Sequence, residues 1–148
     1  DGRMEAPLGR SNRDRKQQAV LPNGRFAATN WTGLRQLPPF ASLVECRLET
    51  GRTHQIRVHM AHIGHGVIGD PVYGRALRSG QMPDNVARTC LAAMRDFERQ
   101  ALHAARLGFD HPVTGQPLSF ETGMPDDMIR LVTTIEDAIA ARARGEGS

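Results

Sequence analysis

The stretch Leu48–Gly74, LETGRTHQIRVHMAHIGHGVIGDPVYG, decides the fold of this 148-residue chain. Its first residues complete a run, 43–49, in which apolar and charged side chains alternate. Such alternation is typical of a β-strand with one buried and one solvated face. Gly51 ends the strand. The stretch therefore opens on a strand followed by a tight turn.

A helix is expected after this turn. Thr53 can cap its N-terminus, and the apolar spacing continues to about Ile63, with Gly64 as the C-terminal cap. Ile56, Met60 and Ile63 fall on one face at helical spacing, so we expect that face to be buried. Strand, glycine turn and helix together form a corner.

Toward the N-terminus, residues 1–16 are predicted to form an irregular basic arm, because glycine and proline interrupt them. Residues 17–21 and 25–37 are predicted to pair as a β-hairpin. The Pro22-Asn23-Gly24 segment between them suits a tight turn, and Pro38-Pro39 ends the second strand.

Toward the C-terminus, glycine and proline predict a loop over residues 66–83, followed by a short helix over 85–97. Residues 101–109 and 117–121 are expected to be strands joined by a turn. The apolar spacing predicts a last helix over Asp126–Ala143 and a frayed tail over 144–148. The pattern favours a single α+β domain, with antiparallel strand pairs and helices on the sheet.

Composition sets broad limits on the kind of protein. The sequence has no apolar run long enough for a membrane span and no signal peptide, so we expect a cytoplasmic protein without a membrane partner. Cys46 and Cys90 are isolated, as is typical of reduced thiols. Residues 1–60 hold ten Lys and Arg against five Asp and Glu. This excess favours a polyanionic partner, although a codon bias toward arginine would give the same composition.

Four histidines lie close together in the quoted stretch: His54, His59, His62 and His65. A metal site is disfavoured, because the only nearby acid is Asp70 and two arginines would repel a cation. Nucleophilic catalysis is also disfavoured, since no Ser or Cys has the glycine-flanked setting that such sites use. We expect neither a metal nor a cofactor.

Arg57 is the residue of most chemical interest in this stretch. It lies at the edge of the apolar helix face, so a partly buried guanidinium is expected, and that group requires a carboxylate or a phosphate. Arg52 lies just before the helix, where free backbone N–H groups favour an anion. Chemistry alone leaves two hypotheses equal: an anion-binding corner, or an ordinary strand–helix salt bridge from Arg57, for which Glu45 and Glu49 are candidate partners.

The amino-acid sequence of the stretch resembles a long motif of the RluA/RluD family of RNA pseudouridine synthases. The similarity continues in PLGR (7–10), RQALHAARLGFDHPVTGQPLSF (99–120) and PDDMIRL (125–131), so it covers essentially the whole chain. The combination of HMAHIGH, GDPVYG and RQALHA is closer to the RluD branch, which acts on large-subunit ribosomal RNA. The resemblance implies the C-terminal portion of a pseudouridine synthase catalytic domain, and with it part of that family's mixed, mainly antiparallel sheet with flanking helices.

The resemblance also implies roles for individual residues. The family's catalytic aspartate lies upstream in an HRLD-type motif that this sequence lacks. Arg57 would pair with that aspartate. The cleft lining or its backbone support would come from Arg52, Thr53, His54 and Gln55, and phosphates would be met by Arg13 and Lys16.

Two functional hypotheses follow. In the first, the intact protein isomerises uridine to pseudouridine in large-subunit ribosomal RNA, and this piece alone is inactive. In the second, the chain is a catalytically empty RNA-binding module. We expect the piece to associate with its missing N-terminal half or with a copy of itself, because half a sheet leaves an open edge.

Overall fold

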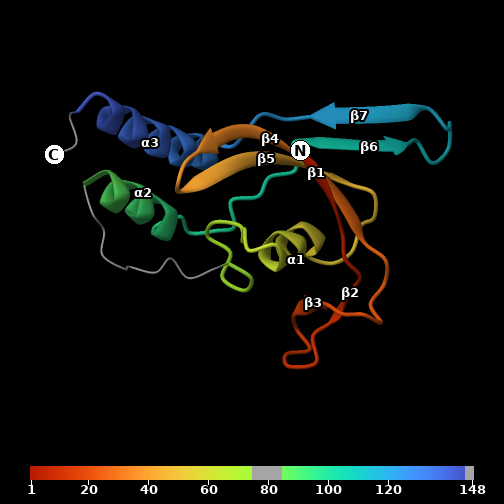
Figure 1. Cartoon of the computed structure of the whole chain (residues 1–148). Coiled ribbons are helices and arrows are strands. Elements are labelled where there is room, and N and C mark those ends of the chain that lie inside the picture. The colour runs from red at the N-terminus through yellow and green to blue at the C-terminus, as the bar shows by residue number, and fades with distance from the viewer. Residues whose placement is uncertain (75–84, 146–148) are drawn as a thin grey trace.

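A computed structural model describes residues 1–74 and 85–145 of the chain (Figure 1). Antiparallel strand pairs and helices interleave along these residues, which gives the expected α+β, mainly antiparallel class. In chain order the elements are β1 (Gly2–Glu5), β2 (Leu8–Arg10), β3 (Gln18–Val20), β4 (Ala28–Leu37), β5 (Ala41–Leu48), α1 (Gln55–His62), α2 (Asn85–Arg95), β6 (Arg106–Asp110), β7 (Pro117–Glu121) and α3 (Asp126–Ala143).

The central sheet has the order β1-β4-β5, with β4 paired antiparallel to both neighbours. The alternating run 43–49 correctly predicted most of β5. Its apolar face is only partly covered, since Leu48 is 49% exposed while Val44 and Cys46 are half-buried. One hydrogen-bonding edge of β5 is also unpaired within the described residues. The sheet thus has an open side.

The N-terminal predictions were wrong in two respects. Residues 1–16 contain the strands β1 and β2 rather than an irregular arm. In addition, β3 pairs with β2 and not with β4, because β1 and β5 occupy both edges of β4. The segment Pro22–Gly24 turns the chain back along β2 instead. At Gly24 an added Cβ would lie 2.8 Å from the Leu8 nitrogen, so this close approach requires glycine.

Helix α1 begins two residues after the predicted cap. Its N-cap is His54 instead of Thr53; His54 lies in the left-handed region at φ 55°, and its side chain makes no capping hydrogen bond. Gly64 follows the helix at φ 84°, as expected of a C-terminal glycine. The predicted apolar face was wrong in part, since Met60 is buried but Ile63 is 43% exposed. The buried face consists instead of Gln55, Val58, His59 and Met60.

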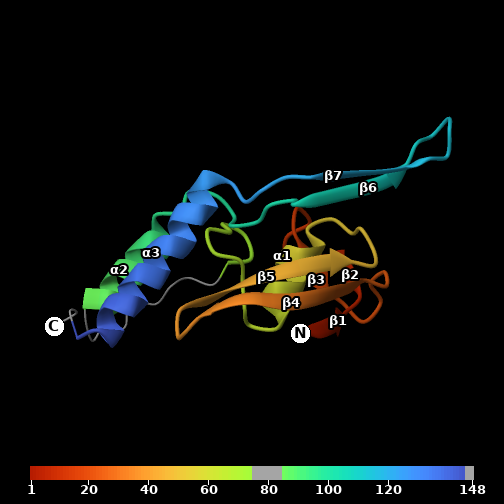
Figure 2. The same cartoon turned by 90° about the horizontal axis from the view of Figure 1, so that it is seen from above.

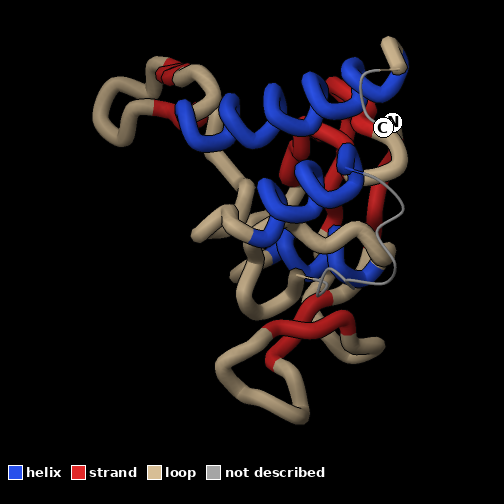
Figure 3. The backbone as a smooth tube through the Cα atoms, turned by 90° about the vertical axis from the view of Figure 1, so that its left-hand side faces the viewer, coloured by secondary structure: helices blue, strands red, loops and turns tan. Residues whose placement is uncertain are grey.

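Helices α2 and α3 pair at one end of the sheet (Figures 2 and 3). The bounds of α3 are those predicted, and α2 is slightly shorter than predicted. Their apolar faces enclose the main core with the end of β4, formed by Leu37, Val86, Cys90, Met94, Leu131, Val132 and Ile135. The amphipathic spacing of both helices explains this core, because each presents one apolar stripe to the other.

The β6–β7 hairpin extends away from the body of the molecule (Figure 2). Strand β6 begins at Arg106 rather than at Ala101, because the Ala101 N–H donates to the carbonyl of Ile68 and holds that part in the body. The expected loop is irregular over 66–74, and its remainder to 83 lies outside the described residues. Most of the expected tail, 146–148, also lies outside them. No helix among the described residues is long and apolar enough to cross a membrane.

Candidate functional site

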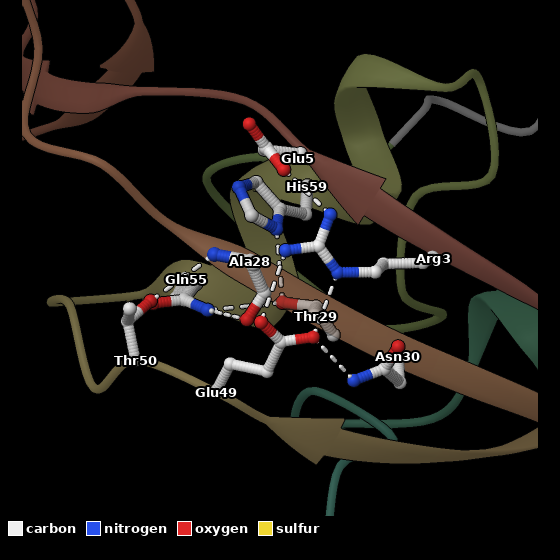
Figure 4. A network of polar contacts seen from close by, with 9 residues as sticks. All are labelled: Arg3, Glu5, Ala28, Thr29, Asn30, Glu49, Thr50, Gln55 and His59. Atoms are coloured by element: carbon white, nitrogen blue, oxygen red, sulfur yellow. Dashed lines mark hydrogen bonds and ion pairs between the residues drawn. The ribbon is translucent and has the colours of Figure 1, made fainter.

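The buried face of α1 contacts the sheet through hydrogen bonds (Figure 4). The Gln55 amide nitrogen donates to the Ala28 carbonyl at 2.9 Å and to Thr29 Oγ1 at 3.0 Å. His59 is fully buried, with Nε2 3.0 Å from the Ala6 carbonyl and Nδ1 2.9 Å from Thr29 Oγ1. A carbonyl only accepts, so Nε2 carries a proton, and the Thr29 hydroxyl can donate to Nδ1. From the Gln55 amide through the Thr29 hydroxyl and the His59 ring to the Ala6 carbonyl, each group can thus donate a hydrogen bond to the next.

The other end of the Gln55 amide fixes the strand–helix turn. Its oxygen accepts from Thr50 Oγ1 at 2.8 Å and from the Arg52 backbone N–H at 3.0 Å. Thr50 Oγ1 in turn accepts from the Ala28 N–H at 3.2 Å. Gln55 is 2% exposed. Its side chain therefore supports the backbone of the corner and does not face solvent.

The two acids proposed from the sequence as salt-bridge partners of Arg57 lie elsewhere. Glu49 accepts from Arg3 Nε at 2.7 Å and from Asn30 at 2.8 Å (Figure 4). These bonds lower the pKa of Glu49 to about 2. Glu45 contacts Arg47 at 3.5 Å. Neither glutamate contacts Arg57, so the two partners suggested for a salt bridge were wrong.

Arg57 forms a bidentate ion pair with Asp70. Arg57 Nε lies 2.7 Å from Oδ2 and Nη2 lies 2.8 Å from Oδ1. The side chains are 11% and 0% exposed, respectively. Burial alone would raise the pKa of Asp70, but bonds from Arg57 and from the backbone N–H groups of Tyr73 and Val72 lower it to about 2. The sequence argument for a buried arginine that requires an acid thus finds its partner within the quoted stretch.

Tyr73 connects this pair to its surroundings. The Arg57 guanidinium lies over the Tyr73 ring, 4.9 Å from its centroid, in a cation–π contact. The Tyr73 hydroxyl accepts from the Gln18 N–H at 2.8 Å and lies 3.0 Å from His54 Nδ1. Gln18 belongs to β3 and His54 precedes α1. One aromatic side chain therefore links the β2–β3 hairpin, the helix start and Arg57.

The other predicted site residues are exposed. Thr53 and His54 lie at the start of α1, and Arg52 donates from Nε to the Phe26 carbonyl at 3.2 Å. Arg13 and Lys16 lie in the loop between β2 and β3. That loop is shaped by Asp14, which accepts from the Lys16 N–H at 2.9 Å. Arg52, Thr53 and His54 thus lie in the segment that leads into α1, where Tyr73 links His54 to Arg57. Arg13 and Lys16 lie on the separate β2–β3 hairpin, which Tyr73 contacts through the Gln18 N–H.

Sequence reasoning assigned no part in this arrangement to Asp70, Tyr73 or His59. The signal for Asp70 was present, because Asp-Pro-Val-Tyr is the kind of sequence in which an Asp side chain accepts backbone N–H groups two and three residues ahead. No comparable local signal marks His59, whose partners are 30 and 53 residues away. Among residues 1–74 and 85–145, no three His, Cys, Asp or Glu side chains lie where they could hold a metal ion.

Comparison with known proteins identifies the fold first. The structure matches Human RNA Pseudouridylate Synthase Domain Containing 1 with a TM-score of 0.62 at 21% identity. The match covers 91% of this chain and 59% of the human chain. At this level of identity the likeness defines the fold, that of a pseudouridylate synthase domain.

Sequence comparison then gives the family. Residues 1–62 match the model of the RNA pseudouridylate synthase family. The chain is 45% identical over 142 residues to Ribosomal large subunit pseudouridine synthase D of Xanthomonas campestris, covering 96% of this chain and 42% of that protein. It is 48% identical to the protein of the same name from Zymomonas mobilis, covering 86% of this chain and 38% of that protein. The chain belongs to the RNA pseudouridine synthase family and spans about two fifths of the length of these relatives.

Proposed function

We propose that the protein containing this chain isomerises uridine to pseudouridine in large-subunit ribosomal RNA. The observation that carries the proposal is the 45–48% identity to two ribosomal large subunit pseudouridine synthases D along nearly the whole chain. The reaction detaches uracil from its ribose, rotates it and rejoins it through carbon 5. The reaction is an isomerisation without net oxidation or reduction, so the enzyme has to stabilise charge and to hold the reacting groups in position, and it needs no redox partner.

Within that enzyme we assign this chain the RNA-binding, arginine-bearing part of the catalytic domain. Arg57 would hold and orient the catalytic aspartate, which would lie in an HRLD-type motif outside these 148 residues. The exposed Arg52, Thr53 and His54 would border the cleft beside it, with Gln55 supporting their backbone. Arg13 and Lys16 would contact phosphates. Enzymes that act on a base take it out of the stack, so a fixed corner beside a basic hairpin suits a flipped nucleotide.

The chain alone is expected to be inactive, since it carries no HRLD motif. The test compares the 148-residue chain with the full reading frame in an assay for pseudouridine in a large-subunit ribosomal RNA transcript. Product is expected only from the full-length protein. Turnover by the 148 residues alone would refute the placement of the catalytic aspartate.

The same assay tests the role of Arg57. In the full-length enzyme Arg57→Lys is expected to reduce turnover at least 100-fold, because an ammonium cannot reproduce the planar fork of a guanidinium. Near-normal turnover would contradict the role. Binding of the RNA by the full-length protein without any product would instead favour an RNA-binding module.

A further inference from the structure

We propose that Asp70 is a positioning residue for Arg57, holding one edge of its guanidinium so that the other edge faces the catalytic carboxylate. This inference rests on the proposed function and adds a second, permanent carboxylate to the site. The role differs from that of the catalytic aspartate, because Asp70 would act only through Arg57.

The position of Asp70 is built into its own loop. Oδ1 accepts from the N–H groups of Val72 at 2.9 Å and Tyr73 at 3.0 Å. The preceding Gly69 has φ 70°, and a Cβ there would collide with the Arg99 carbonyl. The side chain of Asp70 is completely buried. The carboxylate is thus fixed by backbone contacts that do not involve Arg57.

The geometry leaves part of the Arg57 fork free. A guanidinium carries five N–H donors in a rigid plane. Asp70 accepts from Nε and Nη2, which is one edge of that plane. Nη1 makes no hydrogen bond with any residue that the structure describes, so the edge shared by Nη1 and Nη2 remains for a second carboxylate. The Tyr73 ring at 4.9 Å sets the plane itself.

The charges give the inference a distinctive consequence. Arg57 and Asp70 together are neutral, so the pair orients a second carboxylate while adding little net attraction. Without the negative charge of Asp70, the full charge of Arg57 would act on the catalytic carboxylate and lower its pKa. Loss of Asp70 should therefore weaken orientation and also shift the acidic side of the pH–rate profile to lower pH. A residue needed only for folding would not shift that profile.

The alternative is that Asp70 is a substitute partner, which forms an ion pair with Arg57 only when the catalytic aspartate is absent. In that case the intact enzyme would separate Arg57 from Asp70, and replacing Asp70 would leave turnover unchanged. The complete burial of Asp70 and its two backbone bonds favour the permanent role, because a substitute would not require a dedicated site.

The experiment uses the full-length enzyme and compares wild type with Asp70→Asn, Arg57→Lys and the double variant. Asp70→Asn is expected to reduce kcat on the order of 100-fold, with KM and RNA affinity within about twofold of wild type. In the Arg57→Lys background it should cause no further loss, since it acts through Arg57. The matched control is Glu136→Gln on α3. It removes an acid that lies 2.9 Å from Arg35 and should retain wild-type kcat.

The possible outcomes distinguish failure of the role of Asp70 from failure of the proposed function. Wild-type kcat in Asp70→Asn overturns the inference and leaves the proposed function standing. A loss that adds fully in the Arg57→Lys background, or that accompanies equal loss of RNA affinity, also overturns it. If thermal melting shows that Asp70→Asn does not fold, Asp70→Glu replaces it, because it keeps the charge but displaces the carboxylate by one methylene: a fall in kcat on the order of tenfold, absent in the Arg57→Lys background, supports positioning. An additive loss refutes it. Inactive wild-type enzyme refutes the proposed function and this inference with it.

Discussion

Asp70 links the site to the stability of the chain. Its folded pKa of about 2 lies below the ordinary value of 3.8, so the folded state favours its charged form. The resulting stabilisation is complete above pH 4 to 5 and is lost as the pH falls toward 2. The difference corresponds to about 2 kcal/mol.

The expected result is a fall in the free energy of unfolding between pH 5 and pH 2 that is smaller in Asp70→Asn than in wild type. Urea unfolding of the 148-residue chain, followed by circular dichroism at several pH values, measures it. Parallel curves for the two proteins would show that Asp70 does not carry this dependence.

His59 is the residue whose loss should destabilise the fold most selectively. His59→Ala leaves the Ala6 carbonyl and the Thr29 hydroxyl without their imidazole partner and opens a cavity. A loss of about 3 kcal/mol in the free energy of unfolding is expected. The matched control is His62→Ala, one turn along the same helix but exposed, which should change stability by less than about 0.5 kcal/mol. Equal effects would contradict the assigned network.

At the scale of elements, the β2–β3 hairpin carries the strongest concentration of free positive charge. Strand β2 ends at the exposed Arg10, and the loop after it exposes Arg13, Arg15 and Lys16 around a single acid, Asp14. None of these four cations forms an ion pair with a residue that the structure describes. By contrast, arginines 3, 35, 47, 57, 95, 99 and 106 are paired with acids. The hairpin is thus the element best suited to contact phosphates.

The double variant Arg13→Gln/Lys16→Gln is expected to weaken RNA binding by the full-length protein about equally for all sequences. It should also reduce the slope of log affinity against log salt by roughly 1.5. Binding titrations at four salt concentrations measure both effects. Arg95→Gln/Arg130→Gln, with equal charge loss on α2 and α3, is the control and should leave the slope unchanged. A shared decrease would point to net charge and not to the hairpin.

The elements differ in how well the sequence predicted them. Helix α3 and strand β5 were predicted well, because the regular spacing of their apolar residues marks one face of each element. Helix α1 was not, since it buries Gln55 and His59 and exposes Ile63. Polar side chains at a buried interface have no periodic signature, and their partners are distant in sequence. The pairing of β3 was missed for a similar reason, because local spacing does not identify the partner of a strand. A buried arginine that requires an acid was predicted, because that requirement follows from the chemistry of the guanidinium.

At the scale of the whole molecule, an apolar groove separates the sheet from the β6–β7 hairpin. Its lining includes Val44 and Leu48 of β5, Ile56 of α1, Ile63 directly after α1, and Leu107 of β6. His103, also in the lining, has a buried Nε2 with no hydrogen-bond partner among the described residues. Exposed apolar surface beside an unpaired strand edge favours association with another polypeptide.

The 148-residue chain is therefore expected to self-associate in solution, or to bind the remainder of its own protein when both are present. Sedimentation velocity over a tenfold range of concentration measures the first outcome. Leu48→Lys/Ile63→Lys should shift the chain toward monomer, while Val113→Lys, at an 87% exposed position in the β6–β7 turn, should not. A monomeric wild-type chain that also fails to bind the remainder would contradict the prediction.

The polar contact between α1 and β4 also determines how the molecule tolerates change. Contacts between methyl groups have no preferred direction, so an apolar interface accepts small rotations of a helix. Hydrogen bonds require their donors and acceptors to be aligned, so those of Gln55 and His59 restrict the angle at which α1 lies on the sheet. An α-helix turns about 100° per residue, so a slip of one position would carry Arg57 away from Asp70. Insertions in the β6–β7 turn leave this angle unchanged. One residue inserted between Gly51 and Gln55 would instead change the orientation of α1 and so displace the whole site.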